Sequence, residues 1–201
     1  MTASVPASTA PTSPRRFILP AILGLLGYIL DQVTKFWVLS NMHEGETIPV
    51  LPPVLSWHFV RNPGAAFSMG TEYTWVFTII MVVVAAYVIY KFRTTTSKIW
   101  LIVMGTLLGG ILGNLTDRLF QEPGFGLGHV IDFIAVPNFA VFNVADSLIV
   151  CSMIVICILL IKGVPLNDEV DDDLDQVQAP EDQPEPSAVT DADEPTSKNH
   201  E

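Results

Sequence analysis

Residues 129–162 read HVIDFIAVPNFAVFNVADSLIVCSMIVICILLIK, and this stretch decides the class of fold. Its second part, from about residue 141 to residue 161, is apolar and close to the ~20 residues that a helix needs to cross ~30 Å of hydrocarbon. Two acids, Asp132 and Asp146, stand at the front of this span, with no basic residue between or beside them. Ionisable groups at the edge of a span are costly, so these two acids indicate a functional site.

Three further segments have a similar length and composition. They cover about residues 17–40, 73–90 and 99–116. Together with the segment that ends at residue 161, they predict an all-α integral membrane protein with four transmembrane helices. The intervening stretch VLSWHFVRN, residues 54–62, alternates and is rich in aromatic residues, and a turn follows it. A small β-sheet on the extracytoplasmic surface is therefore expected.

The charge of the chain is unevenly distributed. The net charge is −11, and residues 165–201 hold 13 of the 21 acids but a single base, Lys198. The rest of the chain is nearly neutral, so nucleic acid is not an expected partner. We divide the chain into a disordered cytoplasmic leader (1–16), a membrane domain (17–162) and a disordered acidic cytoplasmic tail (163–201).

The basic residues outside the tail predict the orientation of the spans. With the N-terminus in the cytoplasm, six bases lie on the cytoplasmic side and only Arg61 and Arg118 lie outside, which agrees with the positive-inside rule. The six are Arg15, Arg16, Lys91, Arg93, Lys98 and Lys162. Both termini are then cytoplasmic, and the loops at about 42–72 and 117–140 face outward.

The third span carries a helix-packing pattern and a polar group. Gly105, Gly109 and Gly113 recur every four residues on one face, which permits close approach of a second helix. At the outer end of the span lies GNLTDR, where Asn114 and Asp117 share a face and Arg118 points elsewhere. This group serves either as a structural polar knot or as a substrate contact, and the sequence leaves both open.

The first span has its own charged pair. Asp31 and Lys35 are spaced i,i+4 with the acid first, the favourable order for an ion pair on a helix. Mutual neutralisation inside the membrane explains the pair, and a direct role in chemistry is the alternative.

Asp132 and Asp146 lack such a partner nearby in sequence. The two acids are fourteen positions apart, with Pro137 between them, and Asp132 is expected on the outer loop and Asp146 in the first turns of the fourth span. If the carboxyls meet at a dry site they share a proton, which is the arrangement that aspartic peptidases need. Asn143 is expected on the helical face of Asp146, within reach of the acid or the substrate. Two separate capping or interfacial acids are the alternative.

Other chemistries have weaker support. The four histidines show no metal-ligand spacing, and there is no nucleotide-binding motif, so no metal or cofactor is expected. A proton-coupled carrier or channel and a non-enzymatic membrane scaffold remain as alternatives to a peptidase.

Five short sequence motifs, in the order in which they occur, resemble those of a known protein family. DQVTK, RNPGAAFS, GGILGNLTDR, HVIDF and FNVADS, spread over about residues 17–162, closely resemble the lipoprotein signal peptidase family, also called signal peptidase II. The resemblance implies a monomeric aspartic endopeptidase of the bacterial cytoplasmic membrane that works among membrane lipids. Its substrates would be diacylglyceryl-modified prolipoproteins, cut just before the lipidated lipobox cysteine near the extracytoplasmic face.

The resemblance also assigns roles by position. It implies that Asp132 and Asp146 are the catalytic pair. The implied substrate-binding residues are Asn62, Asn114, Arg118 and Asn143. The implied polar framework consists of Asp31, Lys35 and Asp117.

Overall fold

The computed structural model describes residues 14–64 and 73–167. These ranges contain a short 3₁₀ helix η1 (Pro14–Phe17) and the helices α1 (Ile18–Asn41), α2 (Thr74–Thr94), α3 (Lys98–Phe120) and α4 (Val144–Ile161). They also contain the strands β1 (Thr47–Leu51), β2 (Leu55–Asn62) and β3 (Val130–Ala135). The expectations of disorder for the leader and the acidic tail fall mostly on residues 1–13 and 168–201, which lie outside the described ranges.

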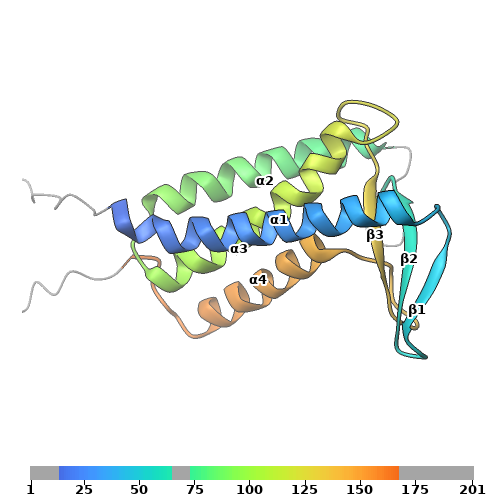
Figure 1. Ribbon diagram of the computed structural model, residues 1–201. Helices are drawn as coiled ribbons and strands as arrows, with labels where there is room; N and C mark the ends of the chain where they lie inside the picture. The colour runs from blue at the N-terminus through green and yellow to red at the C-terminus, as the bar shows by residue number, and fades with distance from the viewer. Residues whose placement is uncertain (1–13, 65–72, 168–201) are drawn as a thin grey trace, which may run out of the picture. The chain divides into compact units, whose positions relative to one another are not determined.

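The four α-helices confirm the predicted fold class. Each is long and apolar enough to cross a membrane, and they lie side by side with the sheet at one end (Figure 1). In its most apolar window α3 is 67% buried, against 17% for each of the other three helices. Therefore α3 is the central helix, and α1, α2 and α4 expose most of their apolar side chains to lipid.

The glycine row of α3 packs against α1, as its spacing predicts. A Cβ atom on Gly105 would collide with the carbonyl of Pro20, and one on Gly109 would collide with the carbonyl of Gly24. At Gly113 an added Cβ would lie 2.6 Å from the carboxylate of Asp31. The two backbones approach closely only because these positions have no side chain.

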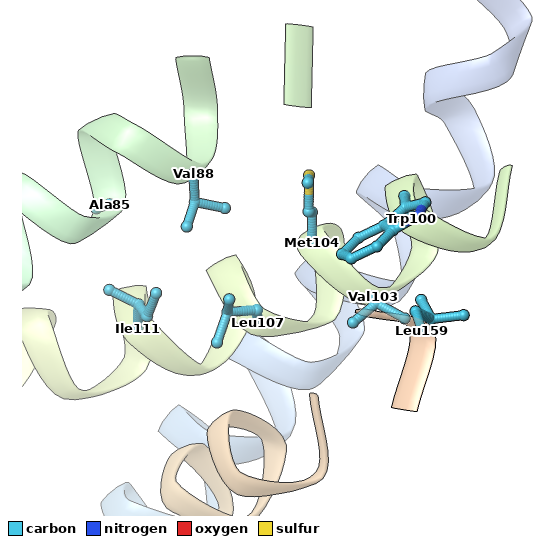
Figure 2. Packing of buried hydrophobic residues seen from close by; sticks show 8 residues of the cluster. All are labelled: Ala85, Val88, Trp100, Val103, Met104, Leu107, Ile111 and Leu159. Atoms are coloured by element: carbon cyan, nitrogen blue, oxygen red, sulfur yellow. The ribbon is translucent and has the colours of Figure 1, made fainter. Parts of the chain in front are cut away.

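The other side of α3 carries the apolar core of the bundle. Figure 2 shows α3 between Val88 of α2 and Leu159 of α4. The cluster consists of Ala85, Val88, Trp100, Val103, Met104, Leu107, Ile111 and Leu159. Thus α2 and α4 are both anchored on α3.

The sheet is antiparallel, with β2 in the middle of the order β1-β2-β3. The alternating segment predicted to be a strand is β2, and its partners come from the two flanking stretches of chain. Ile131 and Phe133 of β3 pack with Phe59 of β2 on Val38 and Met42 at the C-terminal end of α1. This second core fixes the sheet to the helices.

The end of α4 differs from a simple stop at the membrane boundary. After Gly163 (φ +65°) the chain turns back, and Val164 and Leu166 pack against the apolar cluster. The indole N–H of Trp100 donates to the carbonyl of Val164 at 3.1 Å, and the amide of Ser97 donates to the carbonyl of Leu166 at 3.1 Å. Order therefore extends five residues beyond Lys162.

The glycine contact gives a stability prediction. Gly109→Ala should lower the free energy of unfolding by about 1–3 kcal/mol, because the new methyl group must push α1 away from α3. The measurement is thermal unfolding of the purified protein in detergent. Gly124→Ala is the matched control, because a Cβ there meets no atom within 4 Å. Equal melting temperatures for the two variants would contradict the packing argument.

Candidate active site

A buried lysine lies at the base of the site. The ammonium of Lys35 contacts Asp31 at 2.9 Å and Asp117 at 2.7 Å, and it donates to the side-chain carbonyl of Asn114 at 2.9 Å. Lys35 is only 2% exposed, and its three N–H donors meet three oxygen acceptors. The predicted Asp31–Lys35 ion pair is confirmed, and Asp117 joins it from α3.

The two acids of this group also hold backbone from other elements. Asp31 accepts from the amide of Ala145 in the first turn of α4 at 2.8 Å. Asp117 accepts from the amide of Ile131 in β3 at 3.1 Å. One buried charge cluster therefore connects α1 and α3 to the two segments that carry Asp132 and Asp146.

Asp132 lies on strand β3 and not on a loop as expected. Strand alternation explains its direction: Ile131 and Phe133 point into the core below the sheet, so Asp132 points to the opposite face. The expectation of a loop missed β3 because residues 130–135 are a short apolar run interrupted only by Asp132, without the alternation that marks a half-exposed strand. Asn62, on the neighbouring strand, donates to Asp132 Oδ2 at 2.8 Å.

Asp146 lies in the first turn of α4, as expected, but Asn143 does not share its helical face. Asn143 is the N-cap: its Oδ1 accepts from the amide of Asp146 at 2.9 Å, while Asp146 Oδ2 accepts from the amide of Asn143 at 3.1 Å. This reciprocal capping box starts α4 at Val144, three residues after the expected start of the span.

Asn143 also connects the two carboxyls. Its Nδ2 donates to Asp132 Oδ1 at 2.7 Å, so one residue is bonded to both Asp132 and Asp146. Asn114 donates to Asp146 Oδ1 at 2.7 Å and accepts from Asn143 at 3.0 Å. The carboxyls that are fourteen positions apart in the sequence therefore lie in one hydrogen-bonded group.

Arg118 closes another side of this group. Its guanidinium donates to the carbonyls of Pro63 at 2.8 Å, Gly128 at 3.2 Å and Gly64. Arg118 is 1% exposed, and within residues 14–64 and 73–167 its Nε–H has no acceptor. As expected, Arg118 points away from Asp117, and it holds the chain that follows β2.

A cavity of about 270 Å³ lies beside these residues. Its polar lining consists of Asn62, Asn114, Arg118, Asp132 and Asp146. Asp31, Lys35 and Asp117 are buried behind this lining in the charge cluster. Asn143 is fully buried, and its side chain bonds to protein groups on both its oxygen and its nitrogen.

Burial changes the protonation of Asp132. Desolvation raises the pKa of this carboxyl, and the nearby charge of Asp146 raises it further, to about 7. Hydrogen bonds from Asn62 and Asn143 oppose the rise because they favour the charged form. Asp132 is therefore poised to hold a proton near neutral pH.

The apolar wall of the cavity was not predicted from the sequence. Phe139, Val141 and Phe142 line it, and backbone bonds between Phe142 and Ile134 fold this loop back along β3. The apolar run predicts that the fourth span begins at about residue 141, whereas α4 begins at Val144 and residues 141–143 belong to this loop. The pattern Asn-x-x-Asp at 143–146 is a capping box and could have marked the true helix start.

Residues 23–162, most of the chain, match the family described as Signal peptidase (SPase) II. The chain belongs to the signal peptidase II family. It is therefore a multi-pass membrane hydrolase of the aspartic peptidase type, and the predicted resemblance is confirmed.

Individual relatives of this signal peptidase II chain support the same family assignment. The lipoprotein signal peptidase of Leifsonia xyli subsp. xyli is 49% identical over 75% of this chain and 70% of its own length. That of Rhodococcus jostii is 42% identical over 79% of this chain and 81% of its own. A solved structure described as a bacterial membrane enzyme has a TM-score of 0.66 and 28% identity, covering 76% of this chain and 93% of its own.

The charge cluster gives a second stability prediction. Lys35→Met should lower the free energy of unfolding of this signal peptidase II chain by about 3–5 kcal/mol, because Asp31 and Asp117 would stay buried without their cation. Thermal unfolding in detergent measures the effect. Lys98→Met, at an exposed position, is the matched control. If the two variants have the same melting temperature, Lys35 is not the buried partner on which these acids depend.

Proposed function

We propose that this chain removes signal peptides from diacylglyceryl-modified prolipoproteins, with Asp132 and Asp146 as its catalytic pair. The cut falls just before the lipidated cysteine. The observation that carries the proposal is that both carboxyls accept hydrogen bonds from Asn143 at the edge of a polar cavity, Asp132 from its side-chain amide and Asp146 from its backbone amide. The family of the chain supports the reaction, and the site geometry supports the roles of the residues.

The two carboxyls suit different roles. Asp146 lies at the N-terminus of α4 and accepts from Asn114 and from the Asn143 amide, and both the helix dipole and these donors favour its charged form. Asp132, with a pKa of about 7, holds the shared proton. Asp146 then takes a proton from water, the water oxygen attacks the scissile carbonyl carbon, and Asp132 donates its proton to the carbonyl oxygen, which gives a tetrahedral diol. When the diol collapses, the C–N bond breaks, Asp146 gives its proton to the leaving nitrogen, and Asp132 takes a proton back from a diol hydroxyl, so the pair returns to its starting state.

The polar residues around the pair divide into two groups. Asn62, Asn114 and Arg118 line the cavity, where their polar side chains can meet a substrate. We therefore assign these three to substrate binding as well as to support of the dyad. Asn143 is a positioning residue, because its side chain is fully buried, donates to the Asp132 carboxyl and accepts from the backbone amide of Asp146.

The framework and the location follow from the same arrangement. Asp31, Lys35 and Asp117 hold α1, α3, β3 and α4 together below the cavity. We place the dyad at the extracytoplasmic face of the bacterial cytoplasmic membrane and both termini in the cytoplasm. The distribution of bases supports this, and residues 14 and 167 lie at the end of the bundle opposite the sheet (Figure 1).

The lipid on the proposed substrate places the scissile bond at the membrane surface where we locate the dyad. A diacylglyceryl group stays in the bilayer, so it holds the cysteine at the membrane surface. The carboxyls of Asp132 on β3 and Asp146 at the start of α4 then meet the adjoining peptide bond without a further search, and water enters from outside. All the proposed catalytic groups belong to one chain, so a single copy holds a complete dyad.

The dyad gives the central prediction. Asp132→Asn and Asp146→Asn should each lower turnover of a lipidated precursor by at least about 100-fold, because each removes one half of the acid–base pair. Mass spectrometry of the products from purified enzyme in detergent measures this. Glu122→Gln, which removes an exposed acid, is the control and should keep wild-type turnover.

Two other outcomes have distinct meanings. Normal turnover by either aspartate variant would refute the assignment of the pair. A membrane scaffold would lose abundance and thermal stability on substitution without any change in precursor processing per folded molecule.

The raised pKa of Asp132 predicts a pH dependence. As pH rises through about 7, Asp132 loses the shared proton, both carboxyls become charged and the acid needed at the carbonyl oxygen disappears. The value of kcat/KM should therefore fall on the alkaline side with an apparent pKa near 7. A profile that stays flat to pH 9, with thermal stability unchanged over the range, would contradict this.

A further inference from the structure

An apolar groove of about 360 Å³ lies along α3, between α1 and the end of α2. Its lining includes Pro20, Ala21 and Tyr28 of α1, Phe92 of α2, and Gly109 and Leu112 of α3. Asn114, which lines the catalytic cavity, comes two residues after Leu112 and so lies about 200° around α3 from it. The groove is therefore on another side of α3, and the proposed reaction does not use it.

The two ends of the groove differ. At the end toward the sheet, the hydroxyls of Tyr28 and Thr116 form a hydrogen bond of 3.2 Å, which joins α1 to α3 and closes the groove. At the other end the Phe92 ring packs on that of Phe17, with centroids 5.3 Å apart. The guanidinium of Arg16 lies over the Phe17 ring, 4.6 Å from its centroid. Contacts thus lead from the groove to a cation at the start of α1, opposite the sheet (Figure 1).

The described charges at this end of the bundle are all positive. The short helix η1 carries Arg15 and Arg16, and the last turn of α2 carries Lys91 and Arg93. Within residues 14–64 and 73–167 no acid lies on η1, on α2 or on the first half of α3. Arg16 forms no ion pair with the described part of the chain, and its Nε–H has no acceptor there. Arg16 is therefore free to bind an anion from outside the protein.

We propose that this groove binds one acyl chain of an anionic phospholipid, with the phosphate of the lipid at Arg16. The site lies in the leaflet next to η1, which is the cytoplasmic leaflet in the orientation proposed above. A guanidinium suits phosphate because it can donate two parallel hydrogen bonds, and basic pockets between transmembrane helices bind anionic headgroups. Arg16 is half-buried, and its contact with Phe17 holds the cation at the mouth of the groove before a lipid arrives.

The length of the groove matches one leaflet. From Pro20 to Tyr28 it follows eight residue steps of α1, about 12 Å. The hydrocarbon of one leaflet is about 15 Å thick, half of the ~30 Å core. A chain from the opposite leaflet would meet the closed end at Tyr28 and Thr116. The groove therefore fits a lipid whose headgroup lies at the end with Arg16.

The acidic tail is the other candidate partner of Arg16. The described chain ends at Asn167, whose side chain accepts from the Thr96 amide at 3.2 Å, close to the start of α3. The acids that follow in the sequence can neutralise a base at this end of the bundle. A polar, acid-rich segment does not fill an apolar groove, however, because burying its polar groups there is costly. A phospholipid supplies the anion and the hydrocarbon in one molecule.

Lipid retention tests the site without any substrate. Full-length protein in nanodiscs of phosphatidylglycerol and phosphatidylcholine, with the same acyl chains and in equal amounts, is released for native mass spectrometry. Wild type should retain phosphatidylglycerol with about fivefold preference, the effect of one base near an anionic headgroup. Arg16→Gln should lose this preference, and Lys162→Gln, at an exposed base at the end of α4, is the matched control. Equal retention of both lipids by wild type, or an unchanged preference in Arg16→Gln, would overturn the proposal.

A second pair of variants tests the groove itself. Ala21→Trp fills the groove, whereas Ile22→Trp places the same ring on a neighbouring position that is 47% exposed and does not line it. Ala21→Trp should lower retention of phosphatidylglycerol at least as far as Arg16→Gln does, and Ile22→Trp should retain it as wild type does. If the two tryptophan variants retain the lipid equally, the groove does not hold the acyl chain and the proposal is wrong.

A chain that ends at Asn167 separates the lipid from the tail. Its preference for phosphatidylglycerol should equal that of the full-length protein. If only the shortened chain retains the lipid, the tail occupies Arg16 in the full-length protein, and the proposal is overturned. None of these measurements involves cleavage, so their outcome does not depend on the proposed reaction.

Discussion

The structure of the site depends on one buried ammonium group. Lys35 has contacts of 2.7–2.9 Å with Asp117, Asn114 and Asp31. A charge without water needs every donor satisfied, and here the acceptors come from two different helices. The need to satisfy Lys35 therefore fixes the rotation of α1 against α3. The glycine seam between the two helices allows the distance that this geometry requires.

The same cluster determines where the proposed catalytic pair, Asp132 and Asp146, can lie. Asp31 and Asp117 each accept a second bond from the segments that carry the dyad, and Asn114 connects Lys35 to Asp146. The carboxyls themselves are short side chains on a strand and on a capped helix turn, which restricts their movement. The cost of burying charges in the membrane thus has a function, because it aligns the reacting groups before substrate arrives.

The sequence predicted the elements that have a strong period and missed those that do not. Four apolar runs located four helices to within a few residues, and glycine spacing located the packed face of α3. The two aspartates were recognised because charges at the edge of a span are rare and costly. Strand β3 and the loop through Phe139 were not predicted, because their short apolar runs resemble a loop or part of a membrane span. Only the pairing of β3 with Asn62 and Phe142, which are not its neighbours in sequence, identifies it as a strand.

Partners in space were also beyond prediction. The i,i+4 spacing predicts the ion pair between Asp31 and Lys35. No local spacing predicts the contact of Asp117 with Lys35 or of Asn143 with Asp132, because these contacts join distant parts of the chain. The resemblance to a family supplied the roles of these residues without their geometry. The structure adds the reason that three asparagines are needed: each donates to a carboxyl without adding a charge that would hold both acids ionised.

Asn143 has two roles, as the N-cap of α4 and as a donor to Asp132, and this affects how the protein loses activity. The residue that starts α4 is also the residue that connects the two acids, so fraying of a single helical turn would separate the dyad. Helix ends open far more often than whole domains unfold. Loss of catalytic competence on warming, or on thinning of the surrounding bilayer, would then precede the collapse of the bundle, and the enzyme would switch off while still embedded.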